Sequence, residues 1–183
     1  MTDTPEILRL IGDLIRIGTV AEVDLTAARC TVKVGEILTP PLPWLAPRAG
    51  SARSWSPPSV GEQVVLLCPE ADTALGIVLT GLFSDHNAAP ASEDMTLLAF
   101  KDGAQLAYDP AAHRLSAVLP SGGTAVLKAP GGVEIEGDVT ITGTVSVTGK
   151  LEASEDVTAA GISLKTHVHG KVTAGTAVSG APQ

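Results

Sequence analysis

The sequence has little of what binds nucleic acid or crosses a membrane. Aromatic residues make up only 3% of its 183 residues, and 12 Lys and Arg are outnumbered by 20 Asp and Glu, for a net charge of −8. Phosphate backbones are bound by clustered Lys and Arg, and single strands also by stacked aromatic rings, so nucleic acid is not expected as a partner. No apolar run approaches the ~20 residues of a membrane helix. The N-terminus lacks a secretory signal, which predicts synthesis in the cytoplasm.

Cysteine is also scarce, and no catalytic arrangement is recognisable. Cys30 and Cys68 are the only cysteines; a disulfide between them is one alternative, but two small buried thiols are favoured. No Ser/His/Asp arrangement and no phosphate-binding loop occurs at a recognisable spacing, so the chain is not expected to be an enzyme. What the sequence does have is 19 Gly and 13 Pro, which favour short strands and turns over long helices. A mainly β protein is therefore predicted.

Residues 1–17 are predicted to form an N-terminal helix. Thr4 supplies a capping hydroxyl, Pro5 takes the first helical position, and Gly18 ends the segment. The apolar stripe has helical spacing and consists of Ile7, Leu10, Ile11, Leu14 and Ile15. This stripe suits either docking on the helix's own domain or packing against neighbouring subunits, and the sequence leaves both readings open.

Residues 18–84 have the pattern of a small β-barrel. Alternating segments at 18–24 and 29–34 flank a turn, and two further apolar segments lie within 59–69 and 73–83. Four or five short strands with one long proline-rich loop suit a Greek-key barrel of the OB type. OB folds often bind oligomers, yet the acidic balance favours a structural platform. Residues 85–94 are polar and are predicted to be a linker.

Residues 95–130 are predicted to be a connecting region of hairpin-like strands. The expected strands lie at 96–100, 104–109, 113–119 and 124–128. His86 in the linker is interpreted as a solvated loop histidine, and His113, at a strand start after a turn, is not expected to have a function.

A six-residue repeat fills residues 131–166. Glycine opens five of its six units, at Gly131, Gly137, Gly143, Gly149 and Gly161, and Glu155 replaces it once. Apolar residues recur at the third and fifth positions, and the predicted shaft core is Val133, Ile135, Val139, Ile141, Val145, Val147, Leu151 and Val157. A period this regular predicts a β-helix or β-prism with one short strand and one corner per unit.

One chain of six short strands has no second layer to cover its apolar row. Three identical chains wound about a common axis do cover it, so a triangular prism with one strand per side is predicted. Ala153 and Ala159 replace larger residues late in the repeat, which predicts a shaft that narrows toward the C-terminus. At one strand spacing per unit, the shaft would be roughly 30 Å long.

Residues 167–183 are predicted to form an apex and tail. His167 opens a seventh unit and His169 is its third position, which faces inward in the earlier units. Two imidazoles from each of three chains supply six nitrogens, which suit an octahedral transition metal. Fe(II) is the leading candidate, ahead of Ni, Co or Zn. The alternative is a pair of exposed tail histidines, and the hexad register favours the metal.

The chain resembles the phage baseplate assembly protein V family in the barrel segments 61–66 and 76–79, the shaft and the His167-Val168-His169 apex. These proteins are central tail spikes of contractile-tail phages and of related bacteriocins. The resemblance implies a virion protein at the tip of the tail baseplate. It also implies a homotrimer with an OB domain, a triple β-helix and an apical iron held by six histidines, here His167 and His169 of each chain.

By the same resemblance, the OB domain is expected to dock on a tail hub protein. The tip is expected to pierce the host outer membrane when the sheath contracts. Shafts of this family can also hold Ca²⁺ and Cl⁻, for which the resemblance assigns no residues here.

Three other functions share parts of this sequence pattern. A cupin-type enzyme also carries HxH on a strand, but it needs a further acidic ligand and a later histidine, and residues 170–183 contain no Asp, Glu or His. An OB-type binding module lacks the expected basic patch. A spike of a type VI secretion or bacteriocin apparatus keeps the same architecture, and the sequence does not separate it from a phage spike.

Overall fold

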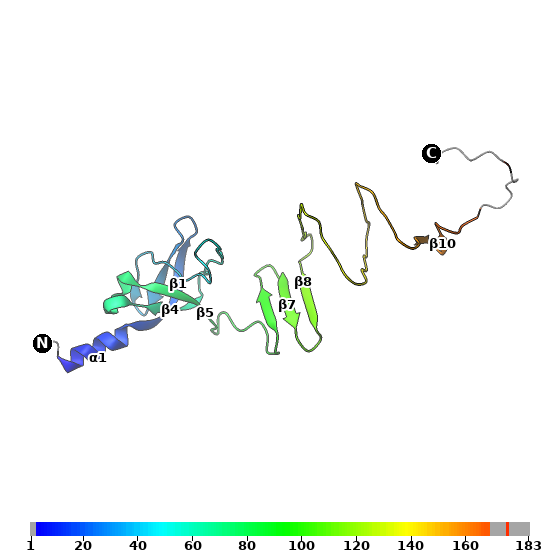
Figure 1. The fold of residues 1–183 in the computed structure, drawn as a ribbon. Coiled ribbons are helices and arrows are strands. Elements are labelled where there is room, and N and C mark those ends of the chain that lie inside the picture. Colours follow the sequence, from blue (N-terminus) through cyan, green and yellow to red (C-terminus); the bar gives the residue numbers. More distant parts are fainter. Residues whose placement is uncertain (1–2, 169–174, 176–183) are drawn as a thin grey trace. The chain divides into compact units, whose positions relative to one another are not determined.

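The computed structural model describes residues 3–168 and residue 175. The chain divides into two compact units, residues 1–126 and 127–183, which are described separately (Figure 1). The first unit contains a helix, a five-stranded sheet and a three-stranded sheet, and the second contains a two-stranded hairpin. The described residues are therefore mainly β with one α-helix, as the sequence predicted.

Helix α1 spans Thr4–Asp13 and is shorter than predicted. Asp3, rather than Thr4, is the N-cap residue, and it makes no side-chain capping bond. Strand β1 already begins at Ile15, which pairs with Leu67 of β4. The helix predicted over residues 1–17 was therefore too long, because ladder hydrogen bonds to β4 outweigh a helical pattern that these residues fit equally well.

Gly18 lies inside β1 and does not end the helix. A Cβ atom at this position would lie 2.5 Å from Cγ1 of Val32 and 2.8 Å from the carbonyl oxygen of Lys33. Gly18 is therefore needed for close packing of the neighbouring strand, a role that glycine often has within sheets.

The five-stranded sheet has the order β3-β2-β1-β4-β5, and every neighbouring pair is antiparallel. Its strands are β1 (Ile15–Asp24), β2 (Arg29–Val34), β3 (Ile37–Leu38), β4 (Gln63–Leu67) and β5 (Ile77–Leu82). The register shifts once between β1 and β2 and once between β4 and β5. Such irregularities bend and twist a sheet, as a small barrel requires. Four of the five strands overlap the predicted segments, and the short strand β3 lies outside them.

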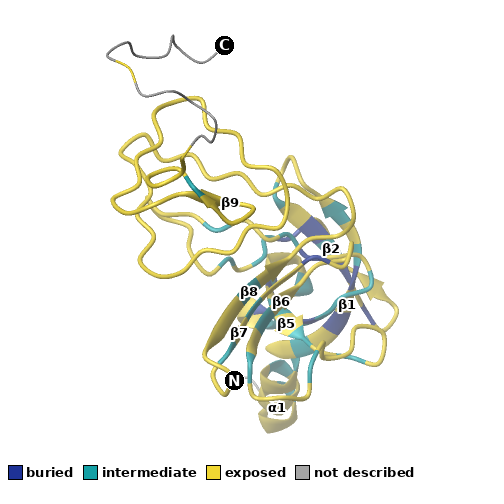
Figure 2. Ribbon diagram, turned by 90° about the vertical axis from the view of Figure 1, so that its right-hand side faces the viewer, coloured by how far each residue is buried: buried dark blue, intermediate teal, exposed yellow. Residues whose placement is uncertain are grey.

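The core of this unit comes from alternate strand positions and two residues outside the strands, Leu42 and Cys68. The buried cluster consists of Val20, Cys30, Val32, Val34, Leu42, Val64, Leu66, Cys68 and Val78. In Figure 2 most of the buried residues lie in or beside this sheet, whereas the second unit is almost entirely exposed. Cys30 and Cys68 are both free thiols, as favoured from the sequence, and burial raises the pKa of each. The two cysteines therefore act as small apolar core residues.

The connecting region forms a three-stranded antiparallel sheet in the order β6-β7-β8. Its strands are β6 (Thr96–Ala99), β7 (Gln105–Asp109) and β8 (Arg114–Val118), close to three of the predicted ranges. The fourth strand, predicted at 124–128, is not formed in the described structure. No described residues pair with this segment, and Val126 and Leu127 are each 75% exposed. An apolar pattern alone does not make a strand when no neighbouring strand is present to complete the ladder.

Truncating the barrel core should destabilise the protein measurably. Leu66 is fully buried, so Leu66→Ala should lower the free energy of unfolding by about 2–5 kcal/mol through lost contacts and a residual cavity. Leu25→Ala is the matched control, since Leu25 is 58% exposed, and should change stability by no more than about 0.5 kcal/mol. Denaturant titration followed by tryptophan fluorescence reports on this unit, because Trp44 and Trp55 both lie in it. Equal effects of the two substitutions would contradict the assigned core.

Candidate functional site: the hexad shaft and its apex

The shaft segment is extended and largely without ladders in a single chain. Of the described residues after 126, only β9 (Thr158–Ala159) and β10 (Ile162–Ser163) pair with each other. Three of the glycines that open repeat units, Gly137, Gly143 and Gly161, have φ angles of +126°, +143° and +82°. Because these angles favour glycine, the repeat places glycine where the chain changes direction.

The apolar row of the repeat is exposed to solvent. The eight predicted shaft-core residues range from 39% exposed at Val157 to 74% exposed at Leu151. Single apolar residues on a surface are ordinary, but a contiguous row at a fixed spacing indicates an interaction surface.

The small hairpin β9–β10 ends the described part of the shaft. Ile162 pairs with Ala159 and Ser163 pairs with Thr158, so only two residues lie in the turn. Ala160 and Gly161 both have positive φ angles, +50° and +82°, as a type I′ turn requires. The backbone twist of such a turn matches that of the two strands, so it joins them in a tight antiparallel hairpin.

Asp156 and Ser163 hold the chain between the hairpin and the first apical histidine. Oδ1 of Asp156 accepts hydrogen bonds from the backbone amides of Val157 at 2.8 Å and Lys165 at 3.2 Å. Oγ of Ser163 accepts from the amides of Thr166 at 2.9 Å and Lys165 at 3.1 Å. The hydrogen bond with the Ser163 side chain, helped by backbone amides, lowers the pKa of Asp156. A charged carboxylate thus organises this turn.

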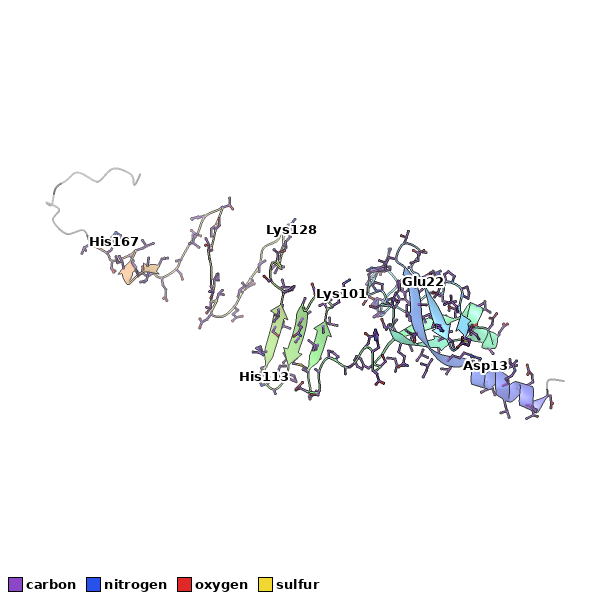
Figure 3. The ribbon with its side chains drawn as sticks, turned by 180° about the vertical axis from the view of Figure 1, so that it is seen from behind. Asp13, Glu22, Lys101, His113, Lys128 and His167 are labelled. Carbon is purple, nitrogen blue, oxygen red and sulfur yellow. The ribbon has the colours of Figure 1, made fainter. Side chains whose placement is uncertain are left out.

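His167 follows directly and its ring is oriented by backbone carbonyls. Its amide donates to the carbonyl oxygen of Ser163 at 3.2 Å. Its Nδ1 lies 3.1 Å from that same oxygen and 3.2 Å from the carbonyl oxygen of Leu164. Carbonyl oxygens only accept hydrogen bonds, so a hydrogen on Nδ1 would satisfy both contacts and hold the ring in one orientation. Figure 3 shows His167 beside the hairpin.

The second predicted ligand, His169, lies outside the described residues. Within residues 3–168 and residue 175, no group of three or more His, Cys, Asp or Glu side chains is arranged to hold a metal ion. The metal site at His167 and His169 therefore stays a prediction that needs more than one chain.

Sequence reasoning missed the role of Asp156 and Ser163. A signal was present, because Ser163 occupies the third position of its unit, where the first five units carry Val or Leu. A polar residue at a position that is apolar elsewhere in a repeat indicates a local change of role.

The remaining histidines show no functional arrangement. His86 and His113 are both exposed, and His113 lies in the turn before β8 with a φ angle of +50°. His86 thus lies in a loop as predicted, and His113 lies one residue before the strand that it was predicted to start. No helix within the described ranges is long and apolar enough to cross a membrane.

Comparison with known proteins defines the class of the barrel and then the family of the chain. Residues 16–83, which contain most of the five-stranded sheet, match the type VI secretion system/phage-baseplate injector OB domain. The chain is also 39% identical over 135 residues to the spike protein of Escherichia phage P2, an alignment that covers 73% of this chain. The aligned segment spans 63% of the length of that relative. The chain belongs to the baseplate assembly protein V family, as its sequence motifs indicated.

Removing the charge of Asp156 should loosen the turn before His167. Because its pKa is lowered in the folded chain, its contribution is present above the ordinary aspartate pKa of 3.8 and is lost as the pH falls below it. We expect the amide resonance of Lys165 to shift in NMR spectra over this acidic range, and Asp156→Asn to abolish that shift. Glu152→Gln, an exposed change in the same segment, is the control. If the Lys165 amide resonance of the Asp156→Asn variant shifted with pH as it does in the unchanged protein, this role of Asp156 would be contradicted.

Proposed function

We propose that this chain is one subunit of a trimeric, membrane-piercing central spike at the tip of a contractile-tail baseplate. Membership of the baseplate assembly protein V family and likeness to the phage P2 spike protein support a spike role in a virion tail. They also support a structural rather than an enzymatic protein. The observation that carries the trimer is the exposed apolar row of the hexad repeat.

Three copies would cover this row by placing it on a common axis. Each of the first five units contributes two apolar side chains to one face and mostly polar side chains to the other, since side chains alternate along an extended strand. The positive φ angles of Gly137, Gly143 and Gly161 let the chain turn at three of the corners between units. Closure into a prism also pairs strand edges that are exposed in one chain. This geometry suits a thin rod that carries an axial load.

Contraction of the tail sheath would drive such a rod through the host outer membrane. Piercing needs a narrow tip that does not splay, and the apolar core becomes thinner where Ala153 and Ala159 replace larger residues. Stability at the tip must therefore come from another source.

A metal ion at the apex would stabilise the tip. His167 follows a turn fixed by Asp156 and Ser163, and its ring lies against two backbone carbonyl oxygens, which fits a ligand held in one orientation. With His169, three chains would offer six imidazole nitrogens, a set that suits octahedral Fe(II). The bound ion would cross-link three chain ends without any catalytic step.

The partners follow from this placement. The OB domain would dock on the tail hub protein, and the apex would meet the host outer membrane. Ca²⁺ or Cl⁻ in the shaft remains a proposal without assigned residues. A spike of a type VI secretion or bacteriocin apparatus is the second candidate, because the matched OB domain is described for type VI secretion systems as well as phage baseplates.

Native mass and metal content test the assembly and the apex together. We expect a particle of three times the 18.6 kDa mass of one chain, carrying one metal ion per three chains. His167→Ala combined with His169→Ala should lose the metal, whereas His86→Ala combined with His113→Ala should keep it. A monomer with one metal ion per chain and an open coordination position would instead favour a small metalloenzyme.

A charge placed in the apolar row should disrupt the shaft. Ile141→Glu would put one carboxylate per chain on the axis, at a cost of about 3–5 kcal/mol per chain for an uncompensated buried charge. Thr140→Glu is the matched control, because the neighbouring side chain faces the opposite side of the strand. Sedimentation should show a dissociated or heat-sensitive Ile141→Glu protein and an unchanged Thr140→Glu trimer. Equal behaviour of the two variants would contradict the proposed packing.

A further inference from the structure

The long loop between β3 and β4 carries both tryptophans of the chain. The rings of Trp44 and Trp55 have centroids 5.6 Å apart and planes inclined by 54°. Trp44 packs against the barrel core, whereas Trp55 is 61% exposed. In a chain with only five aromatic residues, an exposed tryptophan packed at an angle against an anchored one indicates a binding surface, since Trp is enriched among residues that dominate interface energies.

The two tryptophans line a cleft with a volume of about 540 Å³, and three arginines line it as well. Arg48 and Arg53 come from the loop itself, and Arg29 comes from the start of β2. No ion pair in the described structure joins any of the three to a carboxylate. Residues 37–61 contain no Asp or Glu, although the whole chain has a net charge of −8. The cleft is thus a local cationic site on an acidic protein.

The cleft is fixed by backbone hydrogen bonds. The amide of Leu45 donates to the carbonyl oxygen of Val78 at 2.8 Å, and the amide of Val78 donates to that of Pro43 at 2.9 Å. Across the loop, the amide of Ser54 donates to the carbonyl oxygen of Arg48 at 3.0 Å, and Oγ of Ser54 accepts from the amide of Arg48 at 3.0 Å. A surface that is already ordered loses little entropy when it binds.

We propose that this cleft, lined by Trp44, Trp55, Arg29, Arg48 and Arg53, docks an acidic peptide segment of a partner protein. An apolar side chain of the segment contacts the tryptophan pair, and its carboxylates pair with the guanidinium groups, whose planar forks match carboxylate geometry. Nucleic acid fits less well, because a phosphate backbone needs an extended cationic track and is repelled by the remaining acidic surface. The proposal uses neither the trimer nor the metal, and it rests on the proposed function only for the partner's place in the tail.

Fluorescence anisotropy with the full-length protein tests the cleft. The probe is a labelled peptide in which glutamates flank a leucine–proline pair, compared with the same peptide carrying lysines and with a labelled oligothymidine. We expect the glutamate peptide to bind best and to weaken with added salt. Trp55→Ala and the pair Arg48→Glu, Arg53→Glu should each weaken binding at least about tenfold, the scale of a hot-spot residue. Arg114→Glu, an exposed arginine of β8, is the control and should leave binding unchanged.

Three results would overturn the proposal. If the glutamate and lysine peptides bound equally well, or if neither bound, the cleft would not be a site for an acidic segment. Tighter binding of oligothymidine, lost in the arginine variant, would reassign the cleft to nucleic acid. Loss of native mass in the arginine variant would show that a second copy of this chain occupies it. Because Trp55 and both substituted arginines are exposed, circular dichroism should show the variants folded.

Discussion

The apolar row of the hexad repeat is the constraint on which the second unit depends. Its valines and isoleucines alternate with polar residues on a strand too narrow to form a second layer. One chain leaves this row in water, and the described structure shows it exposed along its whole length. In the proposed trimer other copies bury it, and symmetry about the row would then decide where the features of the tip lie.

The two units solve the burial problem in different ways. The barrel buries nine residues among its own strands and loop. Two of them are cysteines, whose thiols serve as small apolar side chains. The shaft segment has no buried residue among those described after residue 126. The first unit can therefore present loops such as the one carrying Trp55 to a partner, whereas the second contributes only one side of a structure that several chains would complete.

Much of the barrel was predictable because its strands alternate and its turns contain recognisable residues. The helix was predicted too long because Ile15 satisfies a helical stripe and a strand ladder alike, and only pairing with Leu67 decides between them. The strand expected at 124–128 has no partner strand among the described residues of one chain, so no ladder forms there. The role of Asp156 also escaped, because its bond to the amide of Lys165 joins residues nine apart. The Trp–Arg cleft combines Arg29 with a distant loop, which only the fold brings together.

Hydrogen exchange of the shaft amides in the full-length protein tests the central claim most directly. An assembled prism pairs the backbone of residues 131–166 between chains, so mass spectrometry should find these amides protected as strongly as those of the barrel strands. Exchange of the shaft at the rate of an unstructured chain, while the barrel stays protected, would contradict the account.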